Sequence, residues 1–305
     1  MSTPPAALTP APEDGRWTPP PGRELVLAVD TLVAGVHFPA GTAPEDVGYK
    51  SLAVNLSDLA AMGAEPLGAE LVLVGPEPDA ARATRIVDGF AALARATATV
   101  TAPVRRAPGP TETLTVLIAG HLPRGAALLR SGARAGDRVC VTGTLGDAAL
   151  ALAALGGAIH PRDEDLAELR RRLDRPQPRL AAGRALRGAA TAAIDLSDGL
   201  SGDLGHILAA SGVGATLTLA ALPVSAAARA AASPERIRAA ALSGGDDYEL
   251  CFTVPADRLE GLAAGWPPAA PPFTVIGTVE DAPGLRCRDE AGRLLTPGAA
   301  WQHFR

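Results

Sequence analysis

Residues 193–204 read AIDLSDGLSGDL and place an acidic turn between a strand and a helix. An apolar run over 191–196 predicts a buried strand that contains Asp195, and the leucines at 200, 204 and 208 predict a helix over 200–211. One acid here would serve as a helix N-cap. Asp195, Asp198 and the hydroxyl of Ser197 together exceed what capping needs, so we interpret the turn as a candidate ligand site, with a capping-only role as the alternative.

The mixture of strands and helices continues on both sides of this turn. The other predicted strands cover 24–29, 67–74, 113–119, 248–254 and 273–279, and the other helices 46–62, 80–96, 147–155 and 164–173. A connecting stretch over 130–142 begins a second unit. The pattern predicts an α/β or α+β protein with a loose N-terminal tail (1–23), an N-terminal metal and nucleotide domain (24–135) and a C-terminal domain (136–305).

Composition narrows the class of function. The 305 residues are 47% hydrophobic and 20% charged with a net charge of −5, which indicates a globular protein without a basic surface for nucleic acid. No apolar run approaches the roughly 20 residues that span a bilayer, so no membrane partner is expected. Cys140, Cys251 and Cys287 form no CxxC pair, and the Pro-rich N-terminus is not a signal peptide, so a cytoplasmic location is expected.

Two further acids lie in apolar surroundings. Asp30 follows the strand at 24–29, where a carboxylate often belongs to a site, although a turn cap is the alternative. Asp58 shares one face of a helix with Ser51 and Asn55, and that face could instead contact water. Scattered oxygen ligands without paired His or Cys suit Mg²⁺ rather than zinc. Because no GxxxxGK[ST] loop is present, the residues alone indicate magnesium-dependent handling of a phosphate by an enzyme that is not of the P-loop type.

Five segments together resemble the thiamine-monophosphate kinase family. They are DTLVAGVHFP (30–39), PEDVGYKSLAVNLSDLAAMGAEP (44–66), RSGARAGDRVCVTGTLGDAALAL (130–152), AIDLSDGLSGDLGHI (193–207) and ALSGGDDYELCFTVP (241–255). The resemblance implies transfer of phosphate from ATP to thiamine monophosphate, giving thiamine diphosphate. It also implies the two-domain fold of aminoimidazole-ribonucleotide synthetase, and a homodimer in which N-terminal strands of both copies form a barrel.

The resemblance also implies the roles of individual residues. The expected Mg²⁺ ligands are Asp30, Asp58, Asp195 and Asp198, the expected ATP contacts are Arg130 and Ser197, and the expected thiamine monophosphate contacts are His37, Asp246 and Trp301. No catalytic residue separate from the metal ligands is expected, because in-line transfer depends on positioning and charge neutralisation. Three of these residues have plainer alternatives: His37 as a core residue, Trp301 as a hydrophobic plug and Asp246 as a turn residue.

Four departures from the family pattern bear on activity. Glu13 stands where an early Gly-Asp-Asp motif is expected, Ala28 and Val29 replace two threonines, and Asp246 replaces a glutamate. The fourth departure is the sequence APVRR over 102–106 in place of a Gly-Gly-Asp-Thr loop. Replacing an acid there by Arg105 or Arg106 changes the interaction with a metal by several kcal/mol at about 5 Å, unless the guanidinium neutralises a phosphate or points into solvent.

These observations predict an active kinase with fewer metal-binding acids than the family pattern has. The main alternative is a relative that binds nucleotide or ligand without turnover. Another enzyme of the same fold is a third possibility, but a selenophosphate synthetase would need an N-terminal cysteine or selenocysteine, and the first cysteine is Cys140. The kinase hypothesis requires that carboxylates distant in sequence gather into one magnesium site.

Overall fold

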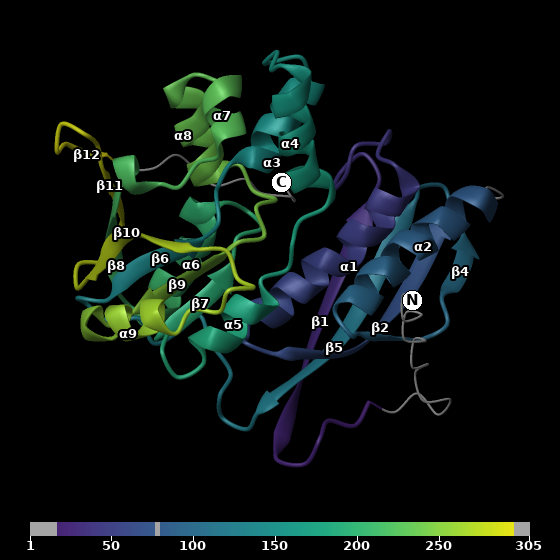
Figure 1. Ribbon diagram of the computed structural model, residues 1–305, viewed down its shortest axis with the longest axis horizontal. Helices are drawn as coiled ribbons and strands as arrows, with labels where there is room; N and C mark the ends of the chain where they lie inside the picture. Colours follow the sequence, from purple (N-terminus) through teal and green to yellow (C-terminus); the bar gives the residue numbers. More distant parts are fainter. Residues whose placement is uncertain (1–16, 77–79, 296–305) are drawn as a thin grey trace, which may run out of the picture. The chain divides into compact units, whose positions relative to one another are not determined.

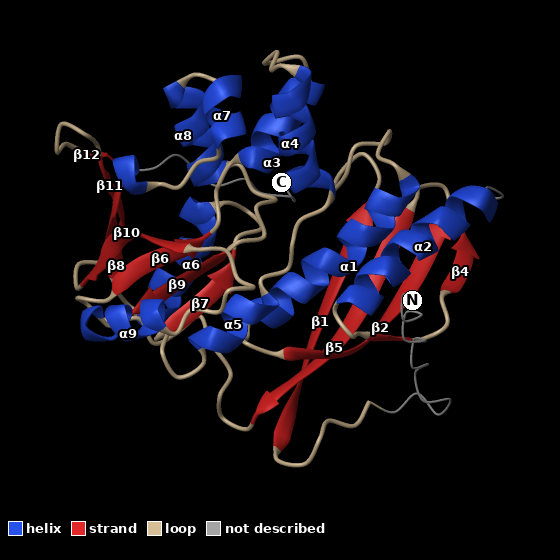
Figure 2. Cartoon of the chain, viewed as in Figure 1, coloured by secondary structure: helices blue, strands red, loops and turns tan. Residues whose placement is uncertain are grey.

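The computed structural model describes residues 17–76 and 80–295 (Figure 1). It divides into two compact units. Unit 1 comprises the described residues up to Leu59 together with Glu65–Gly125, and unit 2 comprises Ala60–Ala64 and the described residues from Ala126 onward. Each unit contains its own β-sheet and helices (Figure 2), so the predicted two-domain α+β class is confirmed.

Unit 1 is built on a five-stranded sheet. Its elements are β1 (Arg23–Val33), α1 (Pro44–Ala61), β2 (Glu65–Gly75), α2 (Ala80–Ala96), β3 (Val100–Thr101), β4 (Arg105–Pro108) and β5 (Thr113–Pro123). The order is β1-β5-β2-β3, and β4 also pairs with β2. β1 and β2 run antiparallel to β5, whereas β3 and β4 run parallel to β2. In Figure 1, α1 and α2 lie along the same face of this sheet.

The other face of β1 is apolar and open. Successive side chains of a strand point to opposite faces of its sheet. Leu32 is buried, while the alternate positions Leu25, Leu27 and Val29 are 39%, 56% and 57% exposed. β1 therefore carries a row of apolar side chains that unit 1 does not cover.

Unit 2 is built on a seven-stranded sheet of order β12-β11-β8-β10-β6-β9-β7. Its strands are β6 (Arg138–Thr142), β7 (Ala192–Asp195), β8 (Gly214–Thr218), β9 (Leu250–Val254), β10 (Phe273–Glu280), β11 (Gly284–Arg288) and β12 (Leu294–Leu295). Its helices are α3 (Asp147–Leu155), α4 (Asp163–Asp174), α5 (Leu180–Leu186), α6 (Leu200–Ser211), α7 (Ala226–Ala231), α8 (Pro234–Ser243) and α9 (Leu259–Ala264), with short 3₁₀ turns η1 (Leu219–Ala221) and η2 (Ala256–Arg258).

Both faces of this second sheet are buried. Along β6, Val139 and Val141 pack in the cluster that contains the leucines of α6, while Cys140 packs in the cluster of α5 and α9. α3, α4, α7 and α8 form a third cluster of mostly alanine and leucine (Figure 1). Strands buried on both faces read as continuous apolar runs, which is why the sequence marks β7 and β9 clearly.

Two local expectations are corrected by the structure. β1 continues to Val33, so Asp30 lies within the strand, opposite Val116 of β5, rather than at its carboxyl end. Residues 105–108 form β4 rather than a loop. In the part of the chain that the structure describes, no helix is both long enough and apolar enough to cross a membrane.

Candidate functional site

The acidic turn of unit 2 connects β7 to α6 as the sequence predicts. Asp195 is the buried last residue of β7, and α6 begins at Leu200. The N-cap residue of α6 is Gly199, with φ of 101°, and as a glycine it has no side chain that could cap the helix. The role of Asp195 and Asp198 as ligand residues stays a prediction, with helix capping as the alternative.

The buried Asp203 holds the backbone of this turn. The side chain is 3% exposed, and Oδ2 accepts a hydrogen bond of 3.0 Å from the backbone N–H of Asp198. Burial, and then the negative charge of Asp195, raises the pKa of Asp203 to about 7. Sequence reasoning missed this residue, although an acid within the first turn of an apolar helix was a visible signal.

The residues after α8 run beside the acidic turn. The N–H of Asp246 donates to the carbonyl of Ser197 at 2.8 Å, and the N–H of Tyr248 donates to the carbonyl of Leu196 at 2.8 Å. The Tyr248 hydroxyl donates to Oδ1 of Asp246 at 3.0 Å. The structure thus brings Asp246 next to Ser197, from a position almost 50 residues further along the chain.

Glycine makes this close approach possible. A Cβ on Gly245 would lie 2.7 Å from the carbonyl oxygen of Ser197, and one on Gly199 would lie 2.9 Å from two backbone carbons of Ser243. Real Cβ contacts are not that short, and both residues have positive φ. The two segments can therefore pack against each other only with glycine at these positions.

Arg130 also belongs to unit 2. It is exposed and lies next to Leu129, whose carbonyl accepts a hydrogen bond of 2.9 Å from the N–H of Ala193 in β7. Arg130 is therefore held beside the start of the strand that ends at Asp195. Four of the predicted site residues of unit 2 (Asp195, Ser197, Asp198 and Asp246) lie in two paired segments, and Arg130 flanks the strand that leads into them.

The predicted site residues of unit 1 lie on β1, on the turn after it and on α1. Asp30 and Asp58 are half-buried. Ser51 and Asn55, which share a helix face with Asp58, are fully buried, so the water-facing alternative for this face is wrong. Oδ1 of Asn55 has no hydrogen-bond partner among the described residues. Nδ1 of His37 accepts a 3.0 Å hydrogen bond from the N–H of Val33, which assigns the ring proton of a neutral imidazole to Nε2.

The two arginines that depart from the family pattern lie in β4. Arg105 is opposite Val72 of β2, its side chain is 77% exposed, and its Nη2 lies 4.0 Å from Oε2 of Glu70. Arg106 lines a cavity of about 470 Å³ in unit 1, between the carboxyl ends of β2 and β4 and the start of α2. Arg82, paired with Glu112 through two hydrogen bonds of 2.6 and 2.7 Å, lines the same cavity.

The metal prediction stays a prediction. Within residues 17–76 and 80–295, no three His, Cys, Asp or Glu side chains form a group that could hold a metal ion. Asp30 and Asp58 belong to unit 1, and Asp195 and Asp198 to unit 2. Glu13 and Trp301 lie outside the described residues.

The chain is similar to proteins of known family over most of its length. Residues 12–120 match the family model of the AIR synthase related protein N-terminal domain, and residues 134–290 match that of the C-terminal domain. The thiamine-monophosphate kinase of Escherichia coli K12 is 45% identical over 287 residues, which cover 93% of this chain and 88% of that protein. The enzyme of Haemophilus influenzae is 36% identical, with 92% and 84% covered.

Solved structures agree with these matches. The thiamine-monophosphate kinase of Stenotrophomonas maltophilia K279a superposes with a TM-score of 0.83 at 44% identity, covering 88% of this chain and 86% of that one. The structure of AaThiL complexed with AMPPCP and TMP superposes with a TM-score of 0.81 at 29% identity, covering 94% and 89%. Fold and sequence thus define a two-domain protein of the AIR synthase related class. Within that class, the chain belongs to the thiamine-monophosphate kinase family.

Proposed function

We propose that this protein transfers the terminal phosphoryl group of ATP to thiamine monophosphate and releases thiamine diphosphate and ADP. The observation that carries the proposal is the pairing of the acidic turn with the segment containing Asp246, in a chain 45% identical to a thiamine-monophosphate kinase. The pairing brings Ser197, the proposed ATP contact, next to Asp246, the proposed contact of the acceptor substrate. Such positioning is the main contribution of a protein to phosphoryl transfer.

Mg²⁺ is the proposed cofactor, with Asp30 and Asp58 of unit 1 and Asp195 and Asp198 of unit 2 as its ligands. The donor set fits this ion, because carboxylate oxygens are the ligands that Mg²⁺ prefers. One Mg²⁺ usually takes one or two carboxylates together with substrate phosphates, so the four acids would be shared between ions. The charges of Asp195 and Asp198 both raise the pKa of the buried Asp203, after the larger effect of burial. Such a concentration of negative charge favours a bound cation. When bound, Mg²⁺ would neutralise charge on the phosphates.

The other proposed contacts follow from residue chemistry. Arg130 is suited to forked hydrogen bonds with phosphate oxygens of ATP. His37, with its ring proton on Nε2, can donate to an oxygen of thiamine monophosphate. Trp301 is suited to stacking on the cationic ring of thiamine. Asp246 would interact with the same cationic substrate, and transfer would proceed in line without a phosphoenzyme.

The proposed partner in assembly is a second copy of this chain. The row formed by Leu25, Leu27 and Val29 on β1 is the support for this proposal, because a strand face with three exposed aliphatic side chains favours burial against another apolar surface. A barrel shared by the N-terminal strands of two copies would cover this row. The cytoplasm is the proposed compartment, because Cys140, Cys251 and Cys287 are all free thiols.

The test of the proposed function is the formation of thiamine diphosphate from purified protein, MgATP and thiamine monophosphate. We expect product with the wild type and a loss of at least about a hundredfold in kcat with Asp198→Asn, which removes one proposed ligand charge. The exposed Asp257→Asn is the matched control and should retain wild-type turnover. Failure of the wild type to form product under these conditions would refute the proposal.

The position of Arg105 favours one second candidate, a relative that binds nucleotide without turnover. Binding of ATP without product would support that candidate. In that case Arg105→Asp in β4 should restore turnover if the missing acid is the defect. The substitution is tolerable for the fold, because the Arg105 side chain is 77% exposed and its ion pair with Glu70 is long, at 4.0 Å.

A further inference from the structure

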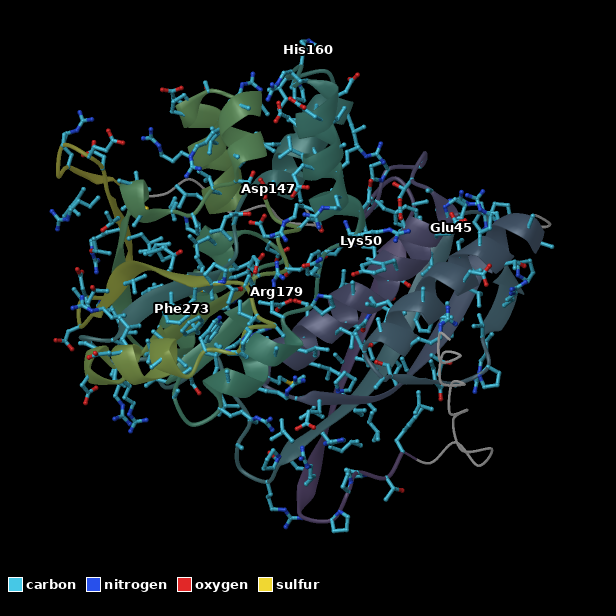
Figure 3. The ribbon with its side chains drawn as sticks, in the orientation of Figure 1. Glu45, Lys50, Asp147, His160, Arg179 and Phe273 are labelled. Carbon is cyan, nitrogen blue, oxygen red and sulfur yellow. The ribbon has the colours of Figure 1, made fainter. Side chains whose placement is uncertain are left out.

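A buried group of charges lies behind the segment that carries Asp246. Glu249 is 0% exposed, and its carboxylate accepts hydrogen bonds from the Thr142 hydroxyl at 2.6 Å and from Nε of Arg179 at 2.7 Å. The Nη2 atoms of Arg179 and Arg172 also donate to this carboxylate. Figure 3 labels Arg179 and Asp147 in this region of unit 2. Glu249 is thus bound by two guanidinium groups and a hydroxyl.

The two arginines come from one stretch of chain. Arg172 lies in the last turn of α4, and Arg179 follows the break formed by Pro176 and Pro178. Arg172 also approaches Asp147 at the start of α3, with 3.7 Å between Nε and Oδ2. The charges therefore join α4 and its exit to the residues immediately before β9.

Asp247 anchors the same segment at a second point. It is buried, and Oδ1 accepts a hydrogen bond of 2.8 Å from the N–H of Gly146, the residue before α3. Asp247 and Glu249 are thus both held inside unit 2. The backbone N–H groups of the alternate residues, Asp246 and Tyr248, bond to the acidic turn.

The backbone between these anchors is strained. Asp246 has φ of 60° and Tyr248 has φ of 49°, and each is a non-glycine residue in the left-handed region. That conformation disfavours residues with a Cβ and persists only where the surroundings hold it in place. The buried anchors at 247 and 249 and the hydrogen bonds to Leu196 and Ser197 supply that restraint.

We propose that Arg172, Arg179 and Glu249 form a positioning clamp that fixes the backbone of residues 246–248 and thereby aims the Asp246 carboxylate at the acceptor substrate. The clamp residues are positioning residues, because Arg172 and Arg179 bond to the buried Glu249 and act on Asp246 through the backbone. The inference rests on the proposed function, since it takes thiamine monophosphate as the molecule that Asp246 meets. Tyr248 completes the arrangement by donating its hydroxyl to Asp246.

The test is a comparison of steady-state kinetics for Glu249→Gln, Arg179→Lys and Tyr248→Phe. Glu249→Gln removes the charge but keeps the shape, Arg179→Lys keeps the charge but loses the planar fork, and Tyr248→Phe removes only the hydroxyl. We expect each change to raise the KM for thiamine monophosphate about tenfold or more, because misplacement of a binding group is costly. The KM for ATP should stay within about twofold, a split that general destabilisation would not produce.

The matched control is Glu168→Gln, which breaks the exposed ion pair between Glu168 and Arg171 on the same helix α4. It should leave both KM values unchanged. If Glu249→Gln does not fold, Tyr248→Phe and Arg179→Lys still test the clamp. Equal increases in both KM values, or no increase for thiamine monophosphate in the folded variants, would overturn it.

A direct binding measurement separates this inference from the proposed function. Thiamine monophosphate is titrated calorimetrically into the wild type and each variant in the presence of Mg²⁺. Wild-type binding without turnover would overturn the kinase proposal but leave the clamp standing if the variants bind more weakly. Turnover by the wild type with equal substrate affinity in all variants would overturn only the clamp. Neither binding nor turnover by the wild type would overturn both.

Discussion

The carboxyl group of Asp247 makes the stability of unit 2 depend on pH. It is buried, its Oδ1 accepts the hydrogen bond from Gly146, and its Oδ2 makes no hydrogen bond to any described residue. Burial raises the pKa of Asp247 well above its ordinary value. The negative charges of Asp147 and Glu249 raise this pKa further, whereas the hydrogen bond from Gly146 and the charge of Arg172 lower it.

The sign and the size of the effect follow from proton linkage. Between the unfolded pKa of about 3.9 and the raised folded pKa, the folded protein keeps a proton that the unfolded chain has released. The free energy of unfolding therefore falls as pH rises, by about 1.4 kcal/mol for each pH unit in which the folded carboxyl stays protonated.

Asp247→Asn removes this contribution. The amide keeps an oxygen for the N–H of Gly146 but cannot ionise, so the stability of the variant relative to the wild type should increase by about 1.4 kcal/mol for each pH unit in which the folded wild-type carboxyl stays protonated. The measurement is urea unfolding at a series of pH values, followed by the fluorescence of Trp266 in a Trp17→Phe, Trp301→Phe background. Trp266 packs on Phe252 and Phe273 and so reports on unit 2.

The exposed Asp257→Asn is the control and should show no such slope. The informative quantity is how the difference in free energy of unfolding between Asp247→Asn and the wild type changes with pH. A difference that is constant with pH would reflect hydrogen bonding alone. A difference between Asp247→Asn and wild type that is flat from pH 5 to pH 7 would refute the assignment of a protonated buried carboxyl.

Two further predictions concern the acidic turn and the open sheet face. Gly245→Ala should destabilise unit 2 by about 1–2 kcal/mol in urea unfolding and raise the KM for thiamine monophosphate, because it places a Cβ 2.7 Å from the Ser197 carbonyl at a positive φ. The control is Gly261→Ala, where a Cβ meets nothing within 4 Å. Leu27→Arg should convert a dimer into monomers in analytical ultracentrifugation, because it puts a charge into the apolar row of β1. A sedimentation coefficient unchanged from wild type would contradict the proposed interface.

Local periodicity predicted the elements whose two faces differ. The helices expected at 147–155 and 200–211 have these bounds in the structure, because leucines recur at helical spacing and glycines 156 and 212 follow the last turn. No comparable pattern marks α7 and α8. Their alanines occupy both buried and exposed positions, so the hydrophobic contrast between faces is weak.

β4 was missed for a different reason. Residues 105–108 read Arg-Arg-Ala-Pro, which has none of the β-branched or aromatic residues typical of strands. The strand forms at the sheet edge through backbone pairing with β2, and such pairing tolerates charged side chains at an exposed edge. The expected loop at this position came from the resemblance to the family and not from the pattern of residues.

The candidate site likewise has one part that was predictable from the sequence and one part that was not. Asp195, Ser197 and Asp198 were predictable because they are adjacent in one motif. The supports were not: Glu249 bonds to Thr142 across 107 residues and to Arg179 across 70. Hydrogen bonds of that sequence separation depend on how strands and helices pack, which single-sequence patterns do not specify.

The two motifs of unit 2 are parts of one structure rather than two separate sites. The carbonyls of Ser197 and Leu196 in the acidic turn accept hydrogen bonds from the N–H groups of Asp246 and Tyr248. The strained backbone at those residues is in turn restrained by the turn and by the buried charges behind it. Loss of this pairing would therefore change where the proposed acceptor contact lies relative to the proposed ATP contact. Because in-line transfer requires both reactants in register, the hydrogen-bonded pairing of these segments matters as much as the identity of the carboxylates.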